Sequence, residues 1–475
     1  MNRVRTVAKN TIVRSISQVL CILLSAFFLM YITRKLGSAD FGKYTLAFSL
    51  AGVLMVVSEM GIHTLLTKKI AQKSDDAAIV YGNILFLKFV FTILFFISLV
   101  IAVNLLNYNN DVTNIVYSMG AFVIITSIFD LINSVFRGYE KMEYEAAVMF
   151  LNRSMVVGSG FYALYMDWGL QNFVIAIIIG NFLSLIPGTV ISLKIFLKPK
   201  MIIRLNMMKN ILKEAFPIGI MLLLTTVGFK AGVVLLSFFK DYSAIGWYGA
   251  PLKFLESALV FPTIFAGALL PVFTSLYKSK EDSILLWFKS CVRLLVIAGL
   301  PVAVFITILS DKIVLILFGS NYSNSIVVLQ LLIWATLFNV LSIILSHILI
   351  AIDKQQLNMI SYGICTIVTI VSSIVLIPLF SYNGAAISLL IGQFLLFITS
   401  FYFTKQTFLR TSLLHLTGKP LASCLIMSIL LYYMREYNLL VSSLLGIGVY
   451  FGFLFITKEL TDKDIVILRS IVKQS

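Results

Sequence analysis

Acidic residues, histidine and cysteine are scarce in this chain. It contains 21 aspartates and glutamates, three histidines and four cysteines among 475 residues. None of the cysteines has the spacing of a metal site, and the sequence has no nucleotide-binding glycine motif and no His-Glu-x-x-His. No connection between apolar stretches is long enough for a catalytic domain. We therefore predict no metal, no cofactor and no enzymatic activity, and we expect the cysteines to be small buried residues without a disulfide.

Charged residues of either sign are also few, at 12%, whereas 60% of the residues are hydrophobic and the mean hydropathy is +0.99. A soluble domain has about 25% charged residues, so this composition predicts a polytopic membrane protein. The short alternating segments of a membrane β-barrel are missing, which leaves an all-α fold. Fourteen apolar stretches are predicted to cross a bilayer as helices. They cover residues 11–33, 41–63, 80–106, 115–137, 146–166, 172–196, 214–239, 250–276, 286–309, 326–351, 359–379, 383–404, 418–434 and 438–457.

Lysine and arginine are distributed unevenly over the predicted connections. With the N-terminus in the cytoplasm, 24 of them flank the spans on the cytoplasmic side and six on the outer side. Because cytoplasmic loops of membrane proteins are enriched in these residues, we predict a multi-pass protein of the cell membrane with both termini in the cytoplasm. The net charge of +16 then reflects topology, and no nucleic-acid partner is expected.

Two short sequence patterns occur twice. Residues 41–44 (FGKY) are echoed by residues 245–248 (IGWY), and residues 136–141 (FRGYEK) by residues 349–354 (LIAIDK). The echoes predict two six-span lobes in the same orientation, a parallel repeat used by several transporters. The predicted parts are an N-terminal lobe (1–197), a cytoplasmic amphipathic linker (198–213), a C-terminal lobe (214–404), and two extra spans with a cytoplasmic tail (405–475). Within the tail, residues 461–473 form either a short interfacial helix or a frayed end.

Several cations lie inside the apolar stretches, and Lys230 is the clearest example. It is about 15 residues from the cytoplasmic end of its predicted span and about nine from the outer end. A lysine that faces lipid at the centre of a span costs on the order of 2.5–3.5 kcal/mol. We therefore expect Lys230 to face a water-filled interior, with an ion pair that holds the lobes together as the alternative.

Other charged residues near the span ends have simpler explanations available. Arg14, Lys289 and Glu59 lie within about two turns of a cytoplasmic end, from which a side chain can reach water. Lys253 and Glu256 are spaced as an i, i+3 pair that can neutralise itself. For these five residues a structural role and a functional role both stay open.

Three charged residues lie deeper, roughly 10–12 Å inside the predicted cytoplasmic boundary at 1.5 Å per residue. They are Lys88, Asp130 and Arg153. A buried ion pair of Asp130 with Lys88 or with Arg153 is the structural alternative to a role in transport. The lone histidines His63 and His347 are expected to be packing residues near helix ends.

The balance of deep charge favours cations, and an interior of that sign attracts phosphate or carboxylate groups. Lysine and arginine also suit a diphosphate. The residues that we predict to bind an anionic substrate are Lys230, Arg14, Lys88, Arg153 and Arg293. The acidic residues that we predict to serve ion coupling or charge pairing are Asp130, Glu59 and Glu256.

An ordered set of loose motifs runs along nearly the whole chain. They are RKLGSADFGKY at 34–44, EMGI at 59–62, FRGYEKM at 136–142, FPI at 216–218, GWY at 246–248, LPVF at 270–273 and LFGSNY at 317–322. The first resembles the R-x-LG-x-x-x-FG-x-Y opening of the polysaccharide-biosynthesis flippases. The set as a whole resembles this oligosaccharide flippase family of the multidrug/oligosaccharidyl-lipid/polysaccharide exporter superfamily.

The resemblance implies two six-helix lobes around a central cavity, often with two further C-terminal helices. It also implies that an oligosaccharide on undecaprenyl diphosphate, or on its dolichol equivalent, is moved from the cytoplasmic to the outer leaflet for O-antigen, capsule or similar polysaccharide assembly. Basic residues would hold the diphosphate while the lobes alternate between inward and outward states. A polysaccharide polymerase and glycosyltransferases would be partners. Relatives often carry an acidic residue in span 7, three positions after an aromatic, where this chain has Gly232 after Phe229, so the resemblance leaves cation coupling at this position in question.

Two other functions fit parts of the sequence. A cation-coupled multidrug or small-molecule antiporter of the related multidrug extrusion family needs deep carboxylates, for which Asp130 is the strongest candidate. A scaffold of a polysaccharide-synthesis complex that transports nothing would not need Lys230. Any transport would draw its energy from an ion gradient, the membrane potential or the downhill fate of the product.

Overall fold

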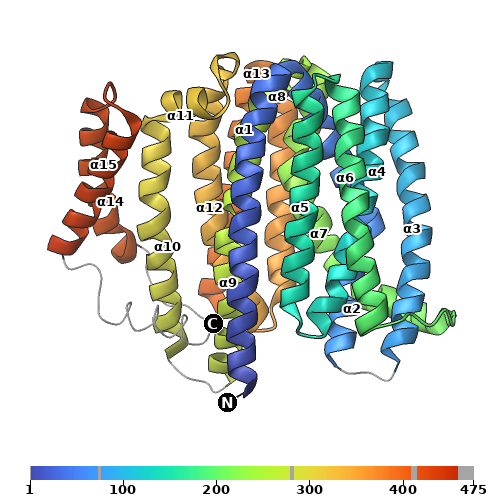
Figure 1. Ribbon diagram of the computed structural model, residues 1–475. Helices are drawn as coiled ribbons and strands as arrows, with labels where there is room; N and C mark the ends of the chain where they lie inside the picture. Colours follow the sequence, from blue (N-terminus) through green and yellow to red (C-terminus); the bar gives the residue numbers. More distant parts are fainter. Residues whose placement is uncertain (1, 73–75, 279–282, 408–413, 458–475) are drawn as a thin grey trace. The chain divides into compact units, whose positions relative to one another are not determined.

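The computed structural model describes residues 2–72, 76–278, 283–407 and 414–457, and the side chains of the first helix from Ile16 onward. The described chain is almost wholly helical (Figure 1). Because a helix satisfies its backbone polar groups within its own segment, it suits lipid surroundings. The chain packs into two compact units that divide after Gly246. The predicted all-α fold is confirmed.

The first unit consists of helices joined by short connections (Figure 1). They are α1 (Asn2–Glu59), α2 (Ile62–Ala71), α3 (Ala77–Leu106), α4 (Asn110–Gly138), α5 (Met142–Tyr165), α6 (Gly169–Ile191) with the π-helical turn η1 (Ser192–Phe196), α7 (Leu205–Phe239) and the start of α8 (Tyr242–Ala258). The second unit continues with further helices. They are α9 (Val260–Lys278), α10 (Ser283–Ile308), α11 (Ser310–Leu317), η2 (Ser320–Tyr322), α12 (Ser325–Ala351), α13 (Gln355–Thr407), α14 (Leu414–Tyr433) and α15 (Leu439–Ile456).

The fourteen predicted spans each coincide with a described helix, with half of one, or with the adjoining pair α8 and α9. Helix α1 contains two spans that meet at a kink where Gly37 has a φ of 70°, and α13 contains two that meet at Ser381 with a φ of 53°. Ten described segments are long and apolar enough to cross a membrane. Two of them hold two spans each, and α5 and α14 account for the remaining spans. The chain is a multi-pass membrane protein.

The second sequence echo corresponds to one backbone turn that is present in both units. Glu140 and Asp353 each have a φ of 58°. In both turns the amide of the following lysine donates a hydrogen bond to the carbonyl five residues earlier, at 3.0 and 2.7 Å. The repeat therefore extends from sequence to backbone. The predicted lobe boundaries, which follow this repeat, stay a prediction.

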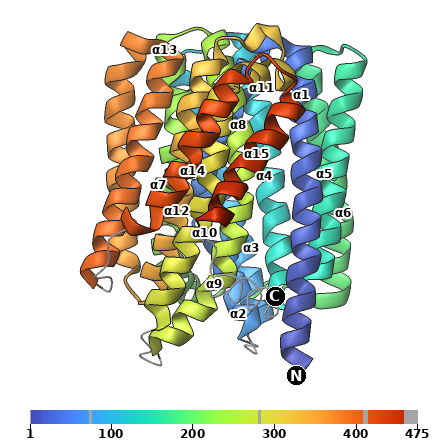
Figure 2. The same ribbon diagram turned by 90° about the vertical axis from the view of Figure 1, so that its left-hand side faces the viewer.

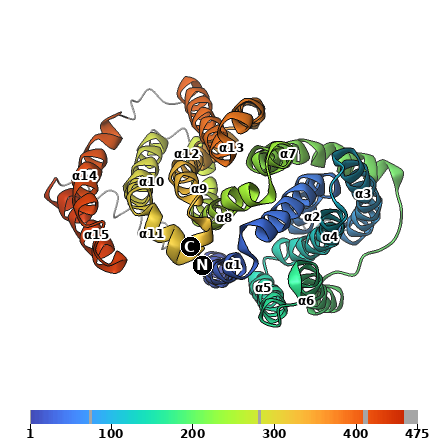
Figure 3. The ribbon, with the colours of Figure 1, turned by 90° about the horizontal axis from the view of Figure 1, so that it is seen from above.

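Within the first unit, α1 packs against α3, α4, α5 and α7, and α6 packs against α4 and α5. The view from above shows α4, α5 and α6 grouped beside α1 (Figure 3). Asn181 of α6 connects them because its amide donates to the carbonyl of Phe122 at 3.1 Å and to Thr126 Oγ1 at 2.9 Å. Its own Oδ1 accepts from Asn152 of α5 at 2.8 Å. This buried polar network fixes how the three helices face one another.

In the second unit, α12 packs against α9, α10 and α13, and α10 packs against α14. Helices α14 and α15 form the pair drawn in red in Figure 2. The side chains of Asn339 in α12 and Gln393 in α13 share a hydrogen bond of 2.8 Å. Tyr450 of α15 donates to the carbonyl of Ile297 in α10 at 2.9 Å. The predicted C-terminal segment 461–473 lies outside the described residues.

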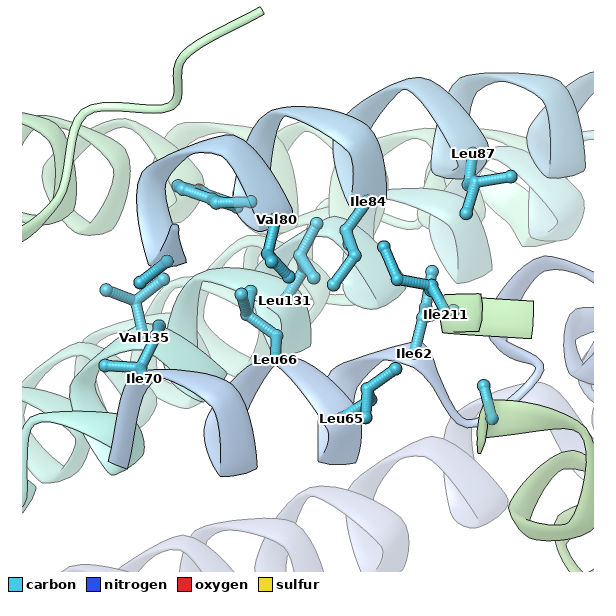
Figure 4. Close-up of a cluster of buried hydrophobic side chains, with 13 residues drawn as sticks. Ile62, Leu65, Leu66, Ile70, Val80, Ile84, Leu87, Leu131, Val135 and Ile211 are labelled. Atoms are coloured by element: carbon cyan, nitrogen blue, oxygen red, sulfur yellow. The ribbon is translucent and has the colours of Figure 1, made fainter. Parts of the chain in front are cut away.

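The second span ends in a break that positions the candidate site. Met60 and Gly61 have φ values of 41° and 75°, which end α1 and redirect the chain into α2. Helix α2 then buries its apolar face against α3, α4 and α7 (Figure 4). The labelled side chains of this core are Ile62, Leu65, Leu66, Ile70, Val80, Ile84, Leu87, Leu131, Val135 and Ile211.

The segment between α6 and α7 is extended and is attached to α3. Asn83 of α3 donates to the carbonyl of Ile202 at 2.8 Å and accepts from the amide of Arg204 at 3.0 Å. Gly82 permits this contact, because a Cβ atom there would lie 2.1 Å from the carbonyl oxygen of Lys200. The apolar side chains of Met201, Ile202 and Ile203 are exposed, and the amphipathic linker over 198–213 stays a prediction, since α7 already begins at Leu205.

Candidate functional site

Lys230 lies against the aromatic face of a helix in its own unit. Its Nζ is 4.4 Å from the centre of the Phe48 ring in α1. Gly52, one turn further along α1, leaves room for the ammonium group, because a Cβ atom there would lie 2.7 Å from Nζ. Phe48 also stacks with Tyr44 at 6.3 Å between ring centres. A cation over an aromatic face gains about 0.5–2 kcal/mol, more when it is shielded from water.

Arg153 of α5 extends this arrangement. Its Nε donates to Ser25 Oγ of α1 at 2.5 Å, and its charge interacts with Tyr44 and Cys21. The face of the first span that carries Ser17 and Ser25 therefore lies against α5. Lys230 thus lies over Phe48, Phe48 stacks with Tyr44, and the charge of Arg153 acts on Tyr44. We refer to these four residues as the cation–aromatic row.

Lys88 lies in a different cluster, at the end of the second span. Its side chain is buried, with 3% of the residue exposed. The ammonium group donates to the carbonyl of Ser58 at 3.0 Å and to Ser127 Oγ. Ser127 in turn donates to Glu59 Oε1 at 3.5 Å. The charges of Glu59 and Asp130 both act on Lys88, and we refer to these five residues as the Lys88 cluster.

Further titratable groups surround the Lys88 cluster. His63 Nδ1 is 3.9 Å from Glu59 Oε1. On the side of α4 and α5, Arg137 Nε is 3.5 Å from Glu145 Oε1, and Arg137 also donates to the backbone carbonyl of Asp130 at 3.4 Å. The sequence left Lys88 and Arg153 open as ion-pair partners of Asp130. The charge of Asp130 acts on Lys88, whereas Arg153 donates its hydrogen bond to Ser25.

Helix α1 carries parts of both groups. Phe48, Gly52 and Glu59 are spaced by four and seven residues, which places them on one helical face. At 1.5 Å per residue, Phe48 and Glu59 are about 16 Å apart along the axis. The face of the second span therefore holds a cation-binding aromatic ring at one level and a carboxylate at another.

The remaining predicted residues are Glu256, Arg293 and Arg14. Glu256 of α8 and Arg293 of α10 belong to the second unit, where the charge of Glu256 acts on Tyr248. The side chain of Arg14 lies outside the described residues. Sequence reasoning missed Tyr44 and Phe48, for which the i, i+4 spacing of two aromatics before Gly52 was the available signal. Within the described ranges, no group of three or more His, Cys, Asp or Glu side chains could hold a metal.

The sequence profile of the family described as "Polysaccharide biosynthesis protein" matches residues 7–277. The chain belongs to this family. Among its relatives is the capsular polysaccharide biosynthesis protein CapF of Staphylococcus aureus, which is 28% identical over 180 residues. That match covers 37% of this chain and 44% of CapF, so it spans less than half of the relative.

Two solved structures show the fold of this family member. The lipid II flippase MurJ in its inward closed conformation superposes with a TM-score of 0.78 at 16% identity, over 94% of this chain and 98% of MurJ. An inward-facing multidrug resistance transporter of the MATE family, in the MOP superfamily, superposes with a TM-score of 0.69 at 14% identity, over 84% of this chain and 98% of the transporter. The transporter fold predicted from the sequence is confirmed.

Proposed function

We propose that the protein is a flippase that moves an oligosaccharide linked to a polyprenyl diphosphate from the cytoplasmic to the outer leaflet by alternating access. Membership of the polysaccharide biosynthesis family supports the substrate class, and the fold shared with a lipid II flippase supports the reaction. The observation that carries the proposal is the placement of Lys230 against Phe48. A cation kept in the apolar middle of a span indicates function more often than structure.

The cation–aromatic row suits a diphosphate. Its two cations, Lys230 and Arg153, offer a point charge and a planar guanidinium, both of which bind phosphate oxygens. The apolar ring of Phe48 lies beside Lys230, and an apolar neighbour strengthens a charge interaction next to it. We propose that the row receives the diphosphate, while Arg14 and Arg293 contribute cations elsewhere on its path.

Glu59, Asp130 and Glu256 are proposed to serve charge pairing or ion coupling. Both termini would be cytoplasmic, as the distribution of lysine and arginine predicts. A polymerase and glycosyltransferases that act on the same lipid-linked glycan would be partners. In this arrangement the substrate is loaded where the basic connections lie and is released on the opposite side.

The test is leaflet transfer of a polyprenyl-diphosphate glycan by protein reconstituted in vesicles. Lys230→Met removes the charge and keeps most of the side-chain volume, and Lys230→Arg keeps the charge. Loss of one hydrogen bond to a charged group, worth about 1.5–3 kcal/mol, predicts transfer lowered roughly ten- to hundredfold in the Met variant. Lys209→Ala removes an exposed charge from the same helix and is expected to transfer at the wild-type rate.

Three results would count against the proposal. Wild-type transfer by the Met variant would remove Lys230 from the mechanism. Absence of glycan transfer by the wild-type protein, together with export of organic cations, would favour the antiporter, for which Glu59 and Asp130 supply interior carboxylates. If cells assemble their glycan normally after Lys230 is replaced, the scaffold is favoured instead.

A further inference from the structure

The atoms around Lys88 have the composition of a cation-binding site. The ammonium group is held by the carbonyl of Ser58 at 3.0 Å and by the hydroxyl of Ser127. The carboxylate of Glu59 follows behind Ser127, at 3.5 Å from its hydroxyl, and the charge of Asp130 also acts on Lys88. Carbonyl, hydroxyl and carboxylate oxygens are the ligands that hard cations select. In this chain the cation that these oxygens contact is the ammonium group of Lys88, a residue of α3.

The position of these oxygens in the fold explains why they attract a cation. Ser58 and Glu59 end α1, directly before the break at Met60 and Gly61. Carbonyls in the last turn of a helix lack amide partners from the following turn, and the helix C-terminus carries partial negative charge. Lys88 supplies both the missing donor and the opposite charge.

The break itself is packed against α7. A Cβ atom on Gly61 would lie 2.9 Å from the carbonyl oxygen of Ala215, and one on Gly219 would lie 3.1 Å from the backbone of Met60. The break is therefore in contact with α7 and, through the carbonyl of Ser58, with Lys88. Because α7 also carries Lys230, the geometry of the break affects the helix that bears the proposed diphosphate ligand.

We propose that Lys88 is a tethered cation. Its ammonium group fills a monovalent-cation site formed by Ser58, Ser127 and Glu59, and in doing so it holds the break between α1 and α2 in place. With the tether in position the native chain takes no free cation there. Without the ammonium group, the same oxygens bind sodium or a small alkylammonium ion from solution. The proposal does not rest on the proposed function.

The test compares purified wild type, Lys88→Ala and Lys88→Met in sodium, methylammonium and N-methylglucamine chloride at equal ionic strength. Melting temperature and hydrogen exchange of residues 56–66 are measured. The Ala variant leaves space for a free ion, so we expect a lowered Tm and faster exchange in N-methylglucamine, both reversed progressively by sodium or methylammonium. Wild type is expected to behave alike in the three salts, and the Met variant, whose side chain fills the site, to stay destabilised in all of them.

A Lys88→Ala variant that does not respond to either small cation overturns the proposal, and so does an equal response by the Met variant, which would be an effect of salt alone. The double variant Glu59→Gln/Lys88→Ala removes one charge of each sign. It is expected to recover Tm in N-methylglucamine and to respond less to sodium. If Lys88→Ala does not fold, the double variant decides the question. A folded double variant whose Tm does not depend on the cation supports the proposal. A double variant that does not fold overturns it, because the charges of Glu59 and Lys88 are then not partners.

Discussion

A methyl group on Gly52 is expected to displace Lys230 from the ring of Phe48 while leaving the protein folded. The Cβ atom of Gly52→Ala would lie 2.7 Å from Lys230 Nζ, 3.3 Å from Cε and 3.5 Å from Cδ. These atoms form the end of a flexible side chain, so the lysine moves and the backbone does not. Contacts between non-bonded heavy atoms are optimal at about 3.5–4.0 Å, so the ammonium group has to retreat by roughly 1 Å.

The energies predict a change in transport without a comparable change in stability. Loss of the cation–aromatic contact costs about 0.5–2 kcal/mol. The replacement of glycine by alanine inside a helix returns about 1 kcal/mol. The two nearly cancel, so Tm is expected to change little. Transfer of the lipid-linked glycan is expected to fall toward that of Lys230→Met, because the charge no longer lies at the same place.

The assay is glycan transfer in vesicles together with Tm for each variant. Gly158→Ala in α5 is the matched control, since a Cβ atom there meets no heavy atom within 4 Å. The control gains the same helix propensity and is expected to transfer normally. Wild-type transfer by Gly52→Ala would refute the reasoning, because the contact between Lys230 and Phe48 would then have no part in transport. A large fall in Tm would also refute it, since it would show that the backbone and not the lysine gives way.

Three further changes test the packing that positions these groups. Asn83→Ala removes the side chain that bonds to the backbone of Ile202 and Arg204. It is expected to speed hydrogen exchange of residues 200–204 and to destabilise the protein by about 1–3 kcal/mol. Unchanged exchange would show that other contacts hold this segment. Ser25→Ala removes the acceptor of Arg153 and is expected to weaken glycan binding more than it lowers Tm, whereas equal binding by the variant would exclude Arg153 from the substrate path. Tyr450→Phe removes the hydroxyl that donates to the carbonyl of Ile297. Because this bond only joins α15 to α10, we expect a lower Tm with unaltered transfer. A transfer defect at unaltered Tm would contradict a purely structural role for Tyr450.

The spans and their breaks could be predicted from the sequence because lipid acts as a uniform solvent. A segment of sufficient length and hydropathy forms a helix there whatever surrounds it, since its backbone polar groups have no other partner. The predicted division near residue 37 is therefore found at Gly37, and that between the eleventh and twelfth spans at Ser381. The echo of residues 136–141 in residues 349–354 corresponds to one turn in both places, because short-range hydrogen bonds decide such a turn.

The partners of the buried cations could not be predicted, because they depend on how each helix is rotated against its neighbours. Lys88 and Lys230 are both lysines deep in apolar spans. Packing places one against a helix end and a serine hydroxyl, and the other against an aromatic ring. Hydropathy is the same for both, so it cannot separate them.

By itself the sequence determined that this protein spans a membrane many times, repeats its architecture and keeps cations inside its spans. The tertiary structure alone decided that Phe48 and Gly52 hold Lys230 and that the break at Met60 and Gly61 is the place of Lys88. The physical reason is the range of the interactions. Burial in lipid and hydrogen bonding along one helix are local to a segment, whereas a side chain finds its partner across helices that are far apart in the chain.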